Sequence, residues 1–171
     1  MKQEKIDDNL IKKKIYDLLS SKETRLAELF KKHEQDIHYY NDSKSEGCGK
    51  YCHCNGKIFI NLNLPDKRKI KNFSLANSVM KTFHEIGHKL DTKSRYYFQS
   101  ELRARKFEYN VAKRLGGSFL EFSSSDFMTL AAAKGDYNTF GQLFNLHTFY
   151  RKQVGMPCSN YHKLFNAKNA N

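Results

Sequence analysis

The sequence predicts one α+β domain of 171 residues, mostly helical with a small β-sheet. Apolar residues recur at helical spacing along most of the chain, which is typical of amphipathic helices that share a core. One short segment instead combines β-branched and aromatic residues and ends in a proline, as a strand does. We expect N-terminal helices over residues 1–40, a core over 57–115 and a C-terminal helical part over 120–171.

Two helices are expected first, over 5–20 and 23–37, because apolar residues lie about four positions apart in both segments. The polar, glycine-bearing stretch 41–56 is expected to form a loop or an irregular hairpin. The best strand follows at 57–64, directly before Pro65.

The next helix is expected over 75–91, with Ser74 as its cap. Another covers 95–115 and should end at the two glycines that follow, since glycine is favoured just past a helix C-terminus. Two more helices are expected over 125–133 and 139–155.

Composition and charge restrict the class of protein. Aromatic residues make up 13% of the chain, so the chain as a whole is not a disordered, solvating tail. No apolar run approaches the ~20 residues of a membrane span, and the N-terminus has no apolar stretch typical of a signal peptide, so we expect a cytoplasmic protein with no membrane partner. The net charge is +12. Residues 51–115 hold most of the excess, with fourteen Lys/Arg and five Asp/Glu, or 14 − 5 = +9. Nucleic acid is not expected as the main partner because no recognition motif accompanies the charge.

Residues His84-Glu85-Ile86-Gly87-His88 form the pattern H-E-x-x-H. On a helix, residues four apart lie on the same face, so both imidazoles can bind one metal ion. Glu85 flanks that face and can accept a proton from a metal-bound water. The pattern therefore predicts a catalytic zinc site, one Zn²⁺ per chain, with Glu85 as the general base.

A zinc site of this kind needs a third protein ligand. Glu101 and Glu108 both emerge at one margin of the apolar stripe of the next helix, where a carboxylate is costly unless it is paired or bound to metal. We expect Glu101 to be the third ligand and keep Glu108, Asp91 and a residue elsewhere in the chain as alternatives. If it is no ligand, Glu108 is expected to form a surface ion pair with Arg105 or Lys106.

The motif, followed by Glu101-Leu102-Arg103-Ala104-Arg105-Lys106-Phe107, resembles the ImmA/IrrE family of zinc metallopeptidases. That family shows H-E-x-G-H and then a helix of the form E-x-x-A-N-x-F-A. The likeness is convincing over residues 57–115. Two positions depart from the pattern: Arg105 stands where the family has Asn, and Glu108 where it has Ala.

The resemblance implies a gluzincin-like fold and a zinc endopeptidase. It implies that His84, His88 and Glu101 bind the metal, that Glu85 is catalytic, and that the substrate is a specific protein such as a helix-turn-helix repressor of a mobile element or stress regulon. Ala104 and Phe107 would be packing positions.

Further roles follow from the residues themselves. The strand before the motif helix could be a sheet edge that pairs with an extended substrate through the stretch containing Ile58, Ile60 and Leu62. A second oxyanion donor is less defined. His147 is the candidate that we carry forward, beside Tyr96, Tyr97 and Tyr137.

Two questions stay open at this point. Cys48, Cys52, Cys54 and Cys158 are expected to be reduced thiols, with a second zinc site or a redox-sensitive loop as alternatives. The alternative function is a catalytically silent module of the same fold that binds a regulator protein or nucleic acid through its basic middle region.

Overall fold

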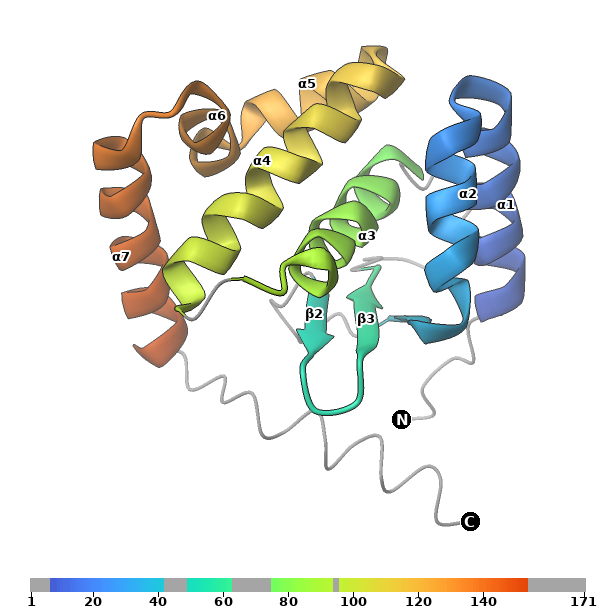
Figure 1. The fold of residues 1–171 in the computed structure, drawn as a ribbon, viewed down its shortest axis with the longest axis horizontal. Helices are drawn as coiled ribbons and strands as arrows, with labels where there is room; N and C mark the ends of the chain where they lie inside the picture. The colour runs from blue at the N-terminus through green and yellow to red at the C-terminus, as the bar shows by residue number, and fades with distance from the viewer. Residues whose placement is uncertain (1–6, 42–48, 63–74, 94–95, 154–171) are drawn as a thin grey trace.

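The computed structural model describes residues 7–41, 49–62, 75–93 and 96–153. It confirms a mostly helical α+β fold with a three-stranded sheet (Figure 1). The elements, in chain order, are α1 (Asp8–Lys22), α2 (Thr24–His33), the 3₁₀-helix η1 (Glu34–Asp36), β1 (Ile37–Tyr40), β2 (Gly49–Cys52), β3 (Lys57–Asn61), α3 (Leu75–Leu90), α4 (Tyr97–Leu115), α5 (Gly117–Ser125), α6 (Phe127–Lys134) and α7 (Tyr137–Gln153).

The N-terminal helices form a hairpin beside the sheet. α1 begins after Asp7, whose carboxylate accepts the backbone N–H of Leu10 at 3.1 Å. The helix predicted over 23–37 is too long at its end: α2 stops at His33, and Ile37 opens β1. Residues 37–40 are β-branched and aromatic, and their pairing with β3 prevails over the helical spacing of Ile37.

The sheet has the order β1-β3-β2. β1 runs parallel to β3 with Ile37 opposite Ile58, and β2 runs antiparallel to β3 with Tyr51 opposite Ile58. The turn between β2 and β3 ends at Gly56, whose φ of +69° favours glycine. The hairpin alternative for the segment before β3 is therefore confirmed over residues 49–61. The last two residues of the predicted strand lie outside the described ranges.

β3 is the central strand, so the prediction that it forms a sheet edge is wrong. Residues 58–60 are paired on both sides, with β1 and with β2. The side chains of Ile58 and Ile60 are fully buried and Leu62 is 4% exposed. These three residues belong to the core and cannot hold a substrate.

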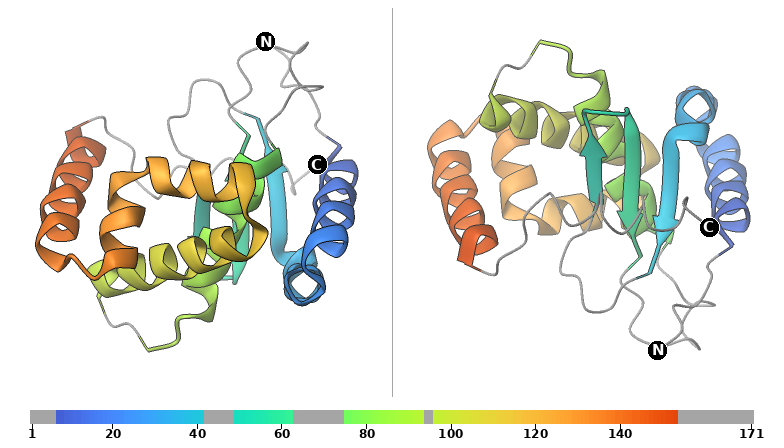
Figure 2. Two further views of the ribbon diagram at one scale, coloured as in Figure 1. Left: turned by 90° about the horizontal axis from the view of Figure 1, so that it is seen from above. Right: turned by 90° about the horizontal axis from the view of Figure 1, so that it is seen from below.

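Helix α3 packs on the buried face of the sheet and carries the centre of the main core (Figure 2). Val79, Phe83 and Ile86 are fully buried, as their common stripe on the helix predicts. Leu90, the last member of that stripe, is 44% exposed because it lies at the end of the helix. The α1–α2 hairpin, the sheet, α4 and α5 complete this core.

Helix α4 belongs to two hydrophobic clusters. Its C-terminal half, through Val111 and Leu115, packs into the main core, whereas Phe98 and Leu102 near its start pack against α6 and α7. The segment between these two contacts faces α3. The topology thus brings the middle of α4 to the motif helix.

One helix was not predicted. α4 ends at Gly116 as expected, but α5 begins directly at Gly117. Both glycines have positive φ, of +66° and +48°, so the chain reverses between the helices without a loop. The predicted helices 125–133 and 139–155 are found as α6 and α7 within a few residues. In the described part of the chain, no helix combines the length and apolarity needed to cross a bilayer.

Candidate metal centre

The site lies where α3 and α4 approach each other most closely, and Gly87 permits that approach. A Cβ atom at Gly87 would lie 3.0 Å from the Cα of Ala104 and 3.2 Å from Cδ1 of Phe107. Both distances are shorter than ordinary carbon contacts of roughly 3.5–4.0 Å. Ala104 is fully buried at this crossing, which confirms it as a packing position. The glycine inside the H-E-x-x-H pattern therefore sets the spacing of the two helices.

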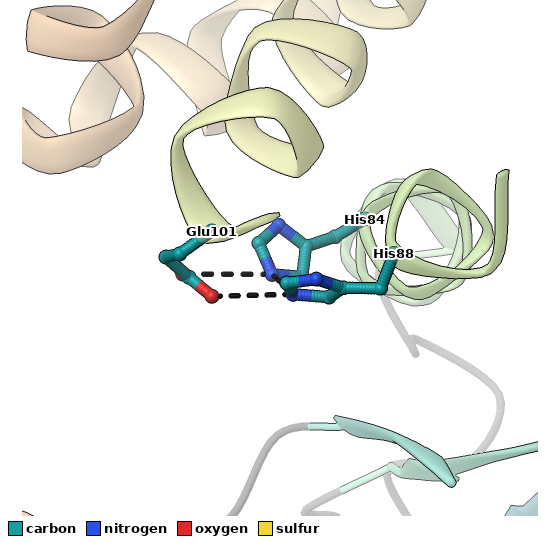
Figure 3. Close-up of side chains that lie close together, drawn as sticks. All are labelled: His84, His88 and Glu101. Atoms are coloured by element: carbon teal, nitrogen blue, oxygen red, sulfur yellow. Dashed lines mark hydrogen bonds and ion pairs between the residues drawn. The ribbon is translucent and has the colours of Figure 1, made fainter. Parts of the chain in front are cut away.

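His84 and His88 leave the same face of α3 and meet Glu101 of α4 (Figure 3). The two Nε2 atoms lie 3.2 Å apart. Oε2 of Glu101 lies 3.2 Å from Nε2 of His88, and Oε1 lies 3.6 Å from Nε2 of His84. Around a tetrahedral ion with bonds of about 2.0–2.1 Å, ligand atoms are about 3.3 Å apart. These three residues could hold a metal ion with the spacing that tetrahedral coordination requires.

The outer nitrogen of each imidazole has its own partner. Nδ1 of His84 lies 3.0 Å from Oε2 of Glu108, and Nδ1 of His88 lies 2.8 Å from the hydroxyl of Ser100. Ser123 of α5 donates its hydroxyl to the other oxygen of Glu108 at 3.1 Å. Such bonds fix the tautomer and orientation of metal-binding histidines, so both Nε2 atoms are directed at one point.

The structure separates the three candidates for the third ligand. Glu101 is 4% exposed and joins the histidines, as predicted, while ligation itself stays a prediction. Glu108 is buried and stands behind His84, so a surface ion pair to Arg105 or Lys106 is the wrong description. Asp91 accepts a hydrogen bond from the guanidinium of Arg103 at 2.9 Å and lies outside the cluster.

Electrostatics keep the cluster charged. Burial disfavours the protonated form of His84, but Glu101, Glu108 and Glu85 outweigh it and raise the pKa of His84 to about 10. Burial likewise favours a neutral Glu101, yet His84, His88 and Arg105 hold its pKa well below the ordinary value. At neutral pH the metal-free cluster therefore consists of a carboxylate and a protonated His84, and a metal cation would displace that proton.

Arg105 lies behind Glu101. Its Nε donates to Oε1 of Glu101 at 2.7 Å. Its Nη1 donates to Asp126 and to the hydroxyl of Thr129, both at 2.8 Å. Asp126 also caps α6 by accepting the backbone N–H groups of Met128 and Thr129. The guanidinium thus links the candidate ligand to the start of α6.

The remaining predicted site residues are only partly placed. Glu85 is 7% exposed, and its charge acts on His84. His147 lies on α7 one turn beyond Phe144, whose ring is 5.4 Å from that of Tyr97, so its role as oxyanion donor stays a prediction. The Tyr97 ring stacks beside His88 at 6.5 Å. Tyr137 instead receives a hydrogen bond from Lys106 at 3.1 Å.

The cysteines and the basic segment are covered in part. Cys52 is buried and Cys54 is exposed, and neither forms a disulfide within the described residues. Cys48, Cys158 and the basic residues of segment 66–71 lie outside those residues. Within the described ranges, the His84 cluster is the one group of three metal-binding side chains. A second group of basic residues in the 51–115 segment lies on α4, at 103–106. Arg103 and Arg105 are in ion pairs and Lys106 contacts Tyr137, so these residues are less available to an anionic partner than the sequence indicates.

Sequence reasoning missed the supporting residues. No sequence pattern indicated Ser100 or Ser123, because each bonds to a residue of another helix: Ser100 to His88 of α3 and Ser123 to Glu108 of α4. Glu108 carried a signal, its position at the margin of the apolar stripe, but this could not distinguish a ligand from a partner of a ligand.

The sequence matches no protein-family model and no curated protein, and the structure matches no solved structure.

Proposed function

We propose that this chain is a zinc-dependent endopeptidase that cleaves a specific protein substrate. The observation that carries the proposal is the convergence of His84, His88 and Glu101 at tetrahedral spacing, with Glu85 next to the first ligand in H-E-x-x-H order. Two histidines and one glutamate are a ligand set of catalytic zinc sites, which keep a fourth position for water or substrate. The resemblance to the ImmA/IrrE family supports the same activity and a gluzincin-like fold.

Zinc, when bound, would lower the pKa of a water molecule and polarise the carbonyl of the peptide bond. His84, His88 and Glu101 would hold it, while Glu108 and Ser100 keep the imidazoles aimed at it. The family pattern has no carboxylate at position 108, so the bond from Glu108 to His84 is a feature of this chain.

Glu85 would move the proton. Its carboxylate accepts a proton from the attacking water and then delivers it to the amine that leaves as the peptide bond breaks. Its 7% exposure keeps the carboxylate away from bulk solvent.

An extended substrate would pair with β2 instead of β3. β2 is a terminal strand of the sheet and packs beside α3. The turn that follows β2 is tied to α3, since Lys89, the residue after His88, donates to the carbonyl of Gly56 at 2.9 Å. On β1, at the other end of the sheet, the N–H of Tyr39 already donates to Asp8 at 3.1 Å. We therefore place the substrate backbone along β2.

The first experiment is zinc analysis of the purified wild type beside His84→Ala and Glu101→Ala. We expect about one zinc per wild-type chain and loss of zinc in both variants. A wild type that binds no zinc after reconstitution would overturn the proposal and favour the silent module that binds a regulator protein or nucleic acid.

Hydrolysis is tested with a variant that keeps the metal. The zinc-loaded wild type and Glu85→Gln are incubated with a peptide library and with helix-turn-helix repressor proteins, the substrate class that the resemblance implies. New peptide N-termini identified by mass spectrometry should appear with the wild type only. The same N-termini with both proteins would mean that Glu85 is not the general base or that a contaminant acts.

A further inference from the structure

The carboxylate of Glu101 presents both of its oxygens to the histidine nitrogens. Oε2 lies 3.2 Å from Nε2 of His88 and Oε1 lies 3.6 Å from Nε2 of His84. Either oxygen, or both together, could reach a metal ion held between the imidazoles. A carboxylate that chelates with both oxygens would occupy the position that hydrolysis needs for water.

One of the two oxygens is already engaged. Arg105 donates from Nε to Oε1 at 2.7 Å, a short charge-assisted hydrogen bond one helical turn along α4. The Arg105 side chain is 12% exposed, so little water competes for this bond. By contrast Arg103, on the same helix, is 49% exposed and pairs with Asp91 away from the cluster.

The guanidinium is itself held in place. Asp126 and Thr129 each accept from Nη1 at 2.8 Å, and both lie at the start of α6. Three partners on two helices leave Arg105 little freedom to release Glu101. The family pattern that the motif resembles has Asn at this position, so the arrangement belongs to this chain.

We propose that Arg105 is a positioning residue that makes Glu101 a one-oxygen ligand and so keeps the fourth coordination position open. This inference depends on the metal binding in the proposed function. It assigns Oε1 to Arg105 and Oε2 to the metal, and it makes the N-terminus of α6 part of the support of the site.

The test replaces zinc by Co²⁺, whose visible absorption changes when an added anion such as azide binds at the open coordination position. Wild type, Arg105→Gln and Arg105→Lys are compared at equal cobalt content, measured by elemental analysis. The wild-type spectrum should change when azide is added. The spectrum of Arg105→Gln should change much less at the same azide concentration, because Glu101 becomes free to chelate and fills that position. Arg105→Lys keeps a cationic donor for Oε1 and should retain the response of the wild type. A purely structural role would leave the response to azide unchanged at equal cobalt content.

Two further variants complete the design. Arg103→Gln removes an arginine from the same helix and should leave the response to azide unchanged. Asp126→Asn keeps a residue that caps α6 but removes an anionic partner of Arg105, so it should weaken the response to azide as Arg105→Gln does. It also carries the test if Arg105→Gln does not fold.

The outcomes separate the two proposals. Identical responses to azide in the wild type and Arg105→Gln, or in the wild type and Asp126→Asn when Arg105→Gln does not fold, would overturn the role of Arg105 and leave the metal site intact. A wild type that binds neither Co²⁺ nor Zn²⁺ would overturn the proposed function and this inference with it.

Discussion

Replacing Gly87 by alanine tests the contact that sets the distance between α3 and α4. The added Cβ would lie 3.0 Å from the Cα of Ala104 and 3.4 Å from its Cβ. The first of these neighbours is backbone and cannot rotate away. To restore ordinary contacts, α4 must retreat by roughly 0.5–1 Å. Glu101 lies one turn before Ala104 on the same helix, so its carboxylate moves away from the two histidines.

Two magnitudes follow for Gly87→Ala. Metal sites tolerate displacements of about 0.2 Å in ligand distance, so we expect zinc affinity to fall by about 10- to 100-fold, as for the loss of a supporting residue. Overpacking costs about 1–3 kcal/mol of unfolding free energy, and alanine returns about 1 kcal/mol through its helix propensity. The net destabilisation should therefore be about 0–2 kcal/mol, too little to unfold the domain.

Zinc affinity is measured by competition with a chromophoric chelator, and stability by urea unfolding of the metal-free protein. Gly141→Ala is the matched control, because a Cβ at this helical glycine of α7 would meet only Cε2 of Phe98, at 4.0 Å. That variant should bind zinc normally and gain about 0.4–1 kcal/mol. If Gly87→Ala matches Gly141→Ala in both affinity and stability, the packing argument is refuted.

Three further results are expected. Because the pKa of His84 is about 10 without metal, zinc must displace a proton below that pH, so apparent affinity should rise about tenfold per pH unit from pH 6 to 8; a flat profile in chelator competition would contradict this. The raised pKa of His84 also stabilises the metal-free fold: its contribution to the free energy of unfolding is complete below about pH 6.5 and diminishes as the pH rises towards 10. The urea midpoint of the metal-free protein should fall over that range. Glu108→Ala leaves Nδ1 of His84 without its partner and should weaken zinc binding by about 10- to 100-fold. Ser123→Ala removes only a hydrogen bond to Glu108 and should weaken zinc binding less. Equal losses of affinity in the two variants would show that the bond from Glu108 to His84 does not support zinc binding.

Local chemistry made much of this fold predictable. α3 and α4 were placed within two residues because periodic apolar positions and the glycines after Leu115 define them. The elements that were missed or left open depend on their partners. β1 was not predicted and forms because residues 37–40 pair with β3, whereas β2 forms the hairpin that the sequence left as one of two alternatives. α5 was not predicted, because it begins at the second of two glycines that elsewhere would simply end a helix.

The candidate site also combines residues that the sequence predicts with residues that only the tertiary structure brings together. Helical spacing alone places His84 and His88 on one face, so the motif predicts two candidate ligands and the adjacent Glu85. Glu101 could be ranked first from its helix wheel, but only the crossing of α3 and α4 shows that it reaches the histidines, while Glu108 stops behind one of them.

The sequence by itself determined the groups that the proposed chemistry uses: two imidazoles one helical turn apart, an adjacent carboxylate, and the helices that carry the candidate ligands. The tertiary structure decided which side chains complete the candidate centre. Arg105 and Ser100 reach the candidate ligands from α4, and Ser123 and Asp126 reach the cluster from segments beyond α4. β3 became a core strand because pairing on both sides buries it. Hydrogen bonds and packing between distant segments depend on how the elements dock, and no local pattern records this.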